Sequence, residues 1–314
     1  MAASAKWDRP VPVSEVFPRF AGQLDLPVES LDPVRLAASC DVAFLALPHG
    51  VSMDLVPGLL SAGRKVIDLA GDFRLKDPAA FQRWYGKPHT HPELLADAVY
   101  GVSELFRDQI PTARLIANPG CYATAVILAC APLLKAKIVE PDSIIVDAKS
   151  GRTGAGRQTV SDWMRAGKQE DLWPYKVNGH QHTPEIEQAL GKVSGQRIPP
   201  ITFVPQVVPM DRGILSTIYL RTSRPVSWQE VHRVYADWYE QGRAPFLKLL
   251  PEGQWPEIRE VVGTNRCDLA FTSDQTKRLL VVIAAIDNLL KGAAGQAVQN
   301  FNLMCGFAET TGLL

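Results

Sequence analysis

The sequence predicts an α/β protein in which a parallel-sheet domain is followed by an α+β domain with a mixed sheet. Three observations support this prediction. The chain has 314 residues, which suggests about two domains. Apolar runs alternate with helical segments between residues 41 and 117, whereas beyond residue 121 several strand-like runs follow one another. Apolar residues make up 46% of the chain, enough for a sizeable core.

The first domain is predicted from three apolar runs. Residues 41–47 and 65–69 are continuous apolar segments, and residues 114–117 form a third, shorter one. Buried parallel strands have this character, and residues 52–62 between the first two read as a helix. Residues 1–35 are rich in proline and show no strong periodicity. Because ligands of parallel sheets bind beyond the carboxyl ends of the strands, we expect the loops after these runs to share one rim.

The second domain begins with an apolar helical stretch at residues 122–135, and residues 288–303 read as a long helix near the end of the chain. Strand-like segments lie between these two helices. They are residues 143–148, 201–208, 214–221, 268–272 and 278–286.

Charge and cysteine content exclude several classes of function. Lys plus Arg and Asp plus Glu balance at 33 each, so the chain offers no electrostatic footprint for nucleic acid or an anionic membrane. The five cysteines show no CxxC spacing, which argues against a disulfide framework or a zinc site. The longest apolar runs are about half a membrane span. We expect a cytoplasmic protein with no nucleic-acid or membrane partner.

Cys121 lies in the run Asn-Pro-Gly-Cys-Tyr at positions 118–122, after a predicted strand and before a predicted helix. At a helix N-terminus the dipole and free N–H groups lower a thiol pKa and can hold an oxyanion. This context favours a nucleophile, although many free cysteines are small buried hydrophobes. The latter is the reading we give to Cys40, Cys130 and Cys305.

Two histidines, His180 and His182, precede a predicted helix start in which Thr183 is the cap, Pro184 the first helical residue and Glu185 in the first turn. A thiol enzyme needs a general base, and histidine suits that role near neutral pH. Metal binding is the alternative, but no further cysteine or carboxylate cluster at ligand spacing supports it. Surface histidines in a loop are the other reading.

Three more segments can be read in two ways. The Gly-rich residues 149–157 could expose backbone N–H groups to an anion, although they lack P-loop spacing and could be a mobile loop. Arg212, in the segment 208–213, could clamp a carboxylate or phosphate, or be an ordinary turn arginine. Small residues at 292–295 would admit a flat ring or a closely packed backbone.

Together these segments resemble the N-acetyl-gamma-glutamyl-phosphate reductase family, of the aspartate-semialdehyde dehydrogenase-like group. The resemblance extends from about Val13 to Leu314. The runs that carry it are residues 44–50, 67–69, 72–75, 118–122, 147–151, 154–156, 182–185, 208–210 with 212–213, and 287–289 with 291–297.

The resemblance implies NADPH-dependent reduction of N-acetyl-glutamyl 5-phosphate to the 5-semialdehyde through a Cys121 thioester, in arginine biosynthesis. It implies a Rossmann-like NADP-binding domain of residues 1–120 plus 288–314, and a catalytic and oligomerisation domain of residues 121–287. It also implies a homodimer or homotetramer.

Roles for individual side chains follow from the same resemblance. A histidine of the pair His180 and His182 would relay protons, with Glu185 as its orienter. The residues implied in substrate binding are Asn118, Ser150, Gly151, Gly154 and Arg212. Those implied in cofactor binding are Pro48, His49, Gly50, Asn288 and Gly292.

The sequence departs from the family pattern at its start. Family members usually begin with a strand and a turn of the kind Gly-x-x-Gly-x-x-Gly, and nothing similar precedes Val13. Absence of that strand would expose edge backbone on its neighbours. Ala70-Gly71 and Gln181 are smaller departures. The alternatives are a catalytically impaired, shortened paralogue or subunit, and the same chemistry on another acyl phosphate such as aspartyl phosphate.

Overall fold

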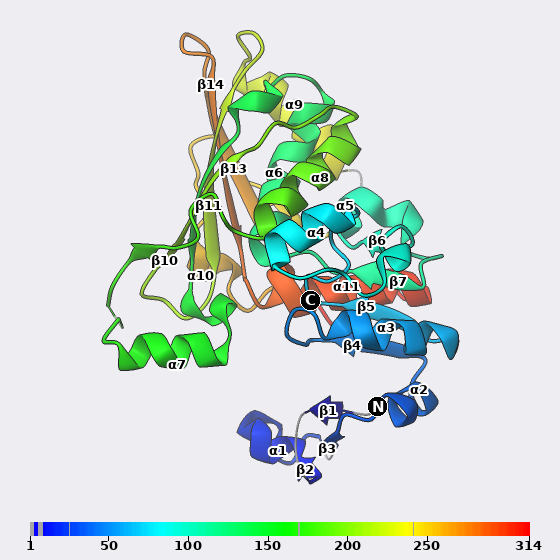
Figure 1. Ribbon diagram of the computed structural model, residues 1–314. Helices are drawn as coiled ribbons and strands as arrows, with labels where there is room; N and C mark the ends of the chain where they lie inside the picture. The colour runs from blue at the N-terminus through cyan, green and yellow to red at the C-terminus, as the bar shows by residue number, and fades with distance from the viewer. Residues whose placement is uncertain (1–2, 6–8, 25, 169, 241) are drawn as a thin grey trace.

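A computed structural model of the chain describes residues 3–5, 9–24, 26–168, 170–240 and 242–314. Three β-sheets organise these residues, and the two larger ones lie side by side with helices between and around them (Figure 1). The N-terminal segment forms a small sheet apart from the other two, at the bottom of Figure 1. Its strands pair in the order β1, β3, β2, with bounds Ala3–Ala5, Pro27–Ser30 and Val11–Pro12.

The parallel sheet has four strands in the order β4-β5-β7-β6. Their bounds are Val42–Leu45, Lys65–Asp68, Leu115–Ala117 and Val99–Tyr100. Helix α3 (Ser52–Ser61) packs with one face of the sheet, and α11 (Gly295–Cys305) with the other. Burial on both faces explains why the strands read as continuous apolar runs. The predicted parallel α/β sheet is confirmed, and β4 lies at one edge of it.

The mixed sheet has seven strands in the order β12-β13-β14-β11-β8-β10-β9. Strands β8 and β10 pair in parallel, as do β12 and β13, whereas the other pairs are antiparallel. In chain order the strands are β8 Ile145–Ser150, β9 Trp173–Pro174, β10 Thr202–Val207, β11 Ile214–Arg221, β12 Leu247–Leu249, β13 Cys267–Asp274 and β14 Leu279–Ile286.

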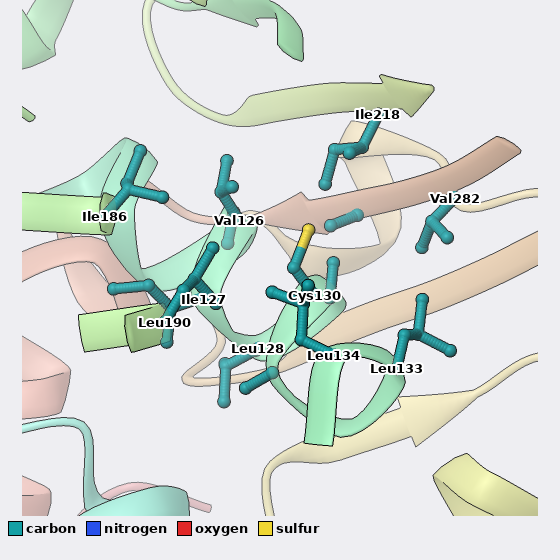
Figure 2. Packing of buried hydrophobic residues seen from close by; sticks show 14 of the residues in the cluster. Val126, Ile127, Leu128, Cys130, Leu133, Leu134, Ile186, Leu190, Ile218 and Val282 are labelled. Atoms are coloured by element: carbon teal, nitrogen blue, oxygen red, sulfur yellow. The ribbon is translucent and has the colours of Figure 1, made fainter. Parts of the chain in front are cut away.

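Helices cover one face of the mixed sheet and leave the other open (Figure 1). They are α6 (Cys121–Lys135), α8 (His182–Ser194) and α9 (Trp228–Tyr239). Helix α6 is buried along almost its whole length, because it lies against the sheet, α8 and α9 at once. Figure 2 shows its apolar side chains packed between those of α8 and of strands β11 and β14. A helix that is apolar all round requires such a central place.

The remaining elements are short. The helices are α1 Val13–Val16, α2 Pro33–Ser39, α4 Pro78–Tyr85, α5 Ser103–Phe106, α7 Arg157–Arg165 and α10 Ile258–Val261. Short 3₁₀ turns cover Pro18–Phe20, Pro92–Leu95, Arg107–Gln109, Pro141–Ser143 and Arg152–Ala155. Within the described part of the chain, no helix has both the length and the apolar content needed to cross a bilayer.

Three sequence-based details are corrected. The helix expected over residues 288–303 begins with a π-helical turn at Leu290–Ala294, and α11 continues from Gly295. Helix α8 begins at His182, so Thr183 lies inside it and its hydroxyl does not cap the helix. Cys130 is buried as expected, but Cys305 is exposed because it ends α11 at the surface.

Candidate active site

A cavity of about 370 Å³ lies where β7 leads into α6, between the parallel and the mixed sheet. It contains seven of the side chains or glycines expected at a functional site. They are Cys121, His180, His182, Ser150, Gly151, Gly154 and His49. The other lining residues are Arg74, Tyr85, Tyr122, Ala155, Thr159, Trp163, Tyr175, Lys176, Gln181 and Val207.

Cys121 is the first residue of α6 and follows directly on a turn that closes around a histidine. A Cβ atom at Gly120 would stand 2.1 Å from Nε2 of His182, so only glycine lets the imidazole approach the turn. Burial raises the pKa of Cys121 to about 11, although the N–H of Tyr122 and the Arg74 cation act in the opposite direction. The expected effect of the helix N-terminus is therefore present, but burial outweighs it.

Beneath the turn lies a buried cluster of Glu185, Arg74 and Tyr100. One carboxylate oxygen of Glu185 accepts from the Tyr100 hydroxyl (2.6 Å) and from the N–H of Gly120 (2.7 Å). The other lies 3.4 Å from the Arg74 guanidinium. Arg74 also donates to the carbonyls of Asn118 (2.9 Å) and Leu69 (2.8 Å). The cluster ties the nucleophile turn to the end of β5.

The two histidines lie edge to face, with ring centroids 4.5 Å apart. The backbone N–H of His182 donates to Nδ1 of His180 (3.1 Å), so a neutral His180 carries its proton on Nε2. Nε2 of His182 lies 3.5 Å from the Arg74 guanidinium. Burial lowers the pKa of both rings, that of His180 to about 2, and the Arg74 cation adds to the effect at His182. Both imidazoles are therefore neutral near pH 7.

Glu185 contacts the Gly120 turn and not the histidines. Within the described residues, no hydrogen bond joins this carboxylate to either imidazole. Glu185 therefore does not stand where a carboxylate that orients a histidine ring would stand. It points from the first turn of α8 toward β6 and the loop before α6.

The Gly-rich loop after β8 is bonded to the turn before β11. The N–H groups of Gly151, Arg152 and Thr153 donate to the carbonyls of Gly213, Met210 and Asp211 at 2.8–3.0 Å. A Cβ atom at Gly151 would stand 2.7 Å from that turn's backbone, so glycine is required by close approach. These three N–H groups are thus committed within the protein and do not form the open anion nest that the composition suggested.

Three further residues expected to touch ligands lie behind the cavity wall. Asn118 is buried; it donates to the Ala293 carbonyl (3.0 Å) and accepts from Asn300 (3.0 Å). Asn288 accepts from the N–H of Gly213 (2.7 Å) and donates to the Thr153 hydroxyl (3.1 Å). Arg212 forms an ion pair with the buried carboxylate of Asp287 (2.8 Å). All three hold loops in place instead of lining the cavity.

The rim after β4 carries the remaining cofactor candidates, Pro48, His49 and Gly50. His49 lines the cavity, and its Nδ1 accepts from the N–H of Gly71 (2.9 Å). Gly50 has φ +85°, and its N–H donates to the Asp72 carboxylate (2.7 Å), which also accepts from Met53 (3.1 Å). The Asp72 carboxylate thus satisfies N–H groups at the N-terminus of α3.

Sequence reasoning missed Arg74, Tyr85, Trp163, Tyr175 and Lys176, all of which line the cavity. The signal for Arg74 was its place just after a predicted strand at the same rim, in the run 72–75. The other four come from segments whose position depends on tertiary packing. Among the described residues, no group of three or more potential metal ligands is found.

Comparison with known proteins agrees with this architecture. The family described as "Semialdehyde dehydrogenase, NAD binding domain" matches residues 1–113, and "Semialdehyde dehydrogenase, dimerisation domain" matches residues 121–288. The structure resembles that of aspartate semialdehyde dehydrogenase II from Vibrio cholerae, with a TM-score of 0.69 at 19% identity, covering 90% of this chain and 84% of that one.

Proteins found by sequence comparison share a much higher identity with this chain. N-acetyl-gamma-glutamyl-phosphate reductase of Geobacter sp. (strain M21) is 50% identical over 303 residues, covering 96% of this chain and 86% of that protein. The protein of the same name from Nitrosococcus oceani is 46% identical over 316 residues, covering 100% and 90%. The chain belongs to the N-acetyl-gamma-glutamyl-phosphate reductase family.

Proposed function

We propose that the protein reduces N-acetyl-glutamyl 5-phosphate to N-acetyl-glutamate 5-semialdehyde and phosphate with NADPH, in arginine biosynthesis. The observation that carries the proposal is Cys121 at the N-terminus of α6, in a cavity with one buried arginine and two neutral histidines. The relatives' shared name supports the substrate.

In the first step the Cys121 sulfur attacks the acyl carbon, a C–S bond forms, and the bond to the phosphate oxygen breaks. Because burial raises the thiol pKa to about 11, the thiol is protonated near pH 7 and its proton needs an acceptor. Nε2 of His182 faces the Gly120–Cys121 turn and would take the proton as the C–S bond forms, because the S–H group becomes strongly acidic once its sulfur adds to the acyl carbon. The N–H that His180 carries on Nε2 can donate to the substrate carbonyl oxygen.

Arg74 is a cation of the cavity lining and would meet the acyl phosphate, while the predicted substrate contact of Arg212 stays a prediction. Its guanidinium lines the cavity and is held by two carbonyls and Glu185, so it is preorganised for an anion. Arg212 is paired with Asp287 behind the wall. Ser150 and Gly154 line the opposite side of the cavity and would contact the rest of the substrate.

NADPH supplies the hydride that reduces the thioester when it is bound. The residues fit its nicotinamide end, because His49 and Tyr85 present aromatic edges at the cavity boundary, with ring centroids 5.3 Å apart. Gly292 is packed against Cys121, where a Cβ atom would stand 2.7 Å from the cysteine Cβ, so close packing of the two segments accounts for this glycine. Residues 1–120 with 288–314 would form the cofactor domain, and residues 121–287 the catalytic and oligomerisation domain.

The open face of the mixed sheet would join two copies into a homodimer. Ile145, Tyr219 and Val281 lie side by side in the register of β8, β11 and β14, and Ile145 and Tyr219 are exposed. The family description of this region as a dimerisation domain supports the assignment. A Tyr219→Glu variant should elute as a monomer in size-exclusion chromatography with light scattering.

The five free cysteines support a reducing, cytoplasmic location.

The test is the reverse reaction. The protein should reduce NADP when given N-acetyl-glutamate semialdehyde and phosphate, and turnover should require both. Aspartate semialdehyde is the competing substrate, and a higher kcat/KM on it would overturn the proposed substrate. Absence of turnover by well-folded protein would support a catalytically impaired paralogue instead.

A further inference from the structure

We propose that Lys291 is a positioning residue for Cys121, acting through the π-helical turn Leu290–Ala294. This inference rests on the proposed function of Cys121 as the nucleophile. Lys291 is completely buried, although lysine is almost never found so unless it is paired. It lies outside the cavity, so it cannot touch substrate there.

The Lys291 ammonium group is held by two partners. Its Nζ lies 2.5 Å from a carboxylate oxygen of Glu104 and 2.7 Å from Oε1 of Gln299. The side chains of Lys291 and Glu104 are both 0% exposed. Burial alone would raise the pKa of Glu104, but Lys291 and Gln299 lower it below its ordinary value, so the carboxylate is charged. The pair clamps the π-helical turn to α5.

The opposite side of the same turn contacts the nucleophile segment. A Cβ atom at Gly292 would stand 2.7 Å from Cβ of Cys121 and 3.1 Å from its Cα. The next carbonyl, that of Ala293, accepts from the Asn118 side chain (3.0 Å). The turn is therefore wedged between the buried ion pair and Cys121. Single π-helical turns are rare and occur often at functional sites.

A buried ion pair is poor evidence for stability, because desolvation can exceed the Coulombic gain. Its benefit here would be geometric: it fixes where the backbone of Gly292 stands, and so it fixes the thiol and keeps water from it. Releasing the turn should admit water to Cys121. Its thiol should then ionise more readily, yet be misplaced for attack on substrate.

The experiment uses Lys291→Met/Glu104→Gln, which removes both charges and leaves no unpaired ion. Iodoacetamide labelling at pH 8 is followed at each cysteine by peptide mass spectrometry. Cys305 is exposed and serves as the reference, and Cys130 is buried in the core and reports global unfolding. We expect labelling of Cys121 relative to Cys305 to rise at least about fivefold, roughly two-thirds of a pKa unit. Cys130 should stay protected.

The turnover number of the double variant should fall while the labelling of Cys121 rises. A displacement of about 1 Å can cost roughly 10²-fold in turnover, so kcat should fall on that order while KM changes little. The matched control is Tyr235→Phe, which removes a buried hydrogen bond to Ala129 (2.6 Å) far from the turn. It should lower the Tm while leaving Cys121 labelling unchanged.

Unchanged labelling of Cys121 would overturn the proposal, as would a parallel rise at Cys130. If the double variant does not fold, Lys291→Gln/Glu104→Gln answers the same question, since it also removes both charges but lets the two side chains keep a hydrogen bond. An inactive wild-type protein whose labelling still responds would refute the proposed function and leave the positioning role standing.

Discussion

Two regions of the cavity, here called the floor and the arm, differ in how far their side chains are buried and hydrogen-bonded. The floor is formed by the turn 118–122 with Arg74, Glu185 and the π-helical turn. It is mostly buried and is joined by hydrogen bonds among these segments. The arm, residues 152–168 and 170–176 with α7, projects from the body in Figure 1. It exposes Leu172 (52%), and the ring of Trp163 packs against that of Trp173 at a centroid distance of 5.0 Å.

This difference separates two tasks. A buried, hydrogen-bonded frame holds reacting groups within tolerances that catalysis needs, whereas a surface arm can change shape to admit and release substrate. Substitutions in the floor should therefore lower kcat, and substitutions in the arm should raise KM. The following predictions test that division from the largest expected effect to the smallest.

Arg74→Met should lower kcat/KM by about 10²–10³-fold, the usual cost of removing a preorganised charge-stabilising donor. Because the Arg74 cation lowers the pKa of Cys121 against the effect of burial, its loss should also slow Cys121 labelling at every pH below 10. Arg74→Lys should recover part of the effect of the positive charge on kcat/KM. It should not recover the hydrogen bonds that the guanidinium makes to its four partners. Equal activity of Arg74→Met and wild type would remove Arg74 from the mechanism.

Trp163→Ala, in the arm, should raise KM by roughly three- to tenfold and leave kcat within about twofold, since it removes binding shared by ground and transition states. Trp163 is the residue of α7 in the cavity lining whose side chain is largest. Steady-state kinetics decide the matter. Trp255→Ala, an exposed tryptophan outside the cavity, is the control and should change neither constant.

Asp68→Asn should stabilise the protein, by an amount that depends on pH. Burial raises the pKa of Asp68 to about 7. The folded state thus binds more protons than the unfolded state between about pH 4 and 7, and stability falls as pH rises through that window. The variant should gain more in Tm at pH 8 than at pH 5, at about 2–4 °C per kcal/mol.

Asp72→Asn is the matched comparison for that variant. Asp72 accepts from the N–H groups of Gly50 and Met53, so its loss should lower the Tm at both pH values. If Asp68→Asn raised the Tm more at pH 5 than at pH 8, the raised pKa assigned to Asp68 would be contradicted.

Much of the fold was predictable from sequence because its signals are local. The strand at β5 and the helix at α6 follow from apolar runs whose burial on both sides leaves no polar alternation. Cys121 was predictable because strand, Pro-Gly turn and helix are adjacent in sequence. The small N-terminal sheet was missed, since its strands of two to four residues carry no periodicity.

The surroundings of other site residues depend on long-range contacts. Whether Arg212 faces the cavity or Asp287 is decided by the packing of β11 against β14, about 70 residues apart in sequence. The amides of Asn118 and Asn288 likewise bond to distant loops, and their predicted contacts with ligands stay predictions. The lowered thiol pKa expected from the helix N-terminus ignored burial, which a single sequence does not report.

The most direct measurement is the intact mass of the enzyme after incubation with N-acetyl-glutamate semialdehyde and NADP in the absence of phosphate. Without phosphate to release it, the N-acetylglutamyl group should remain on the protein as a thioester, and peptide mapping should place it on Cys121. Addition of phosphate should discharge it, and Cys121→Ala should carry no adduct. Turnover without an adduct on Cys121, or turnover by Cys121→Ala, would contradict the account.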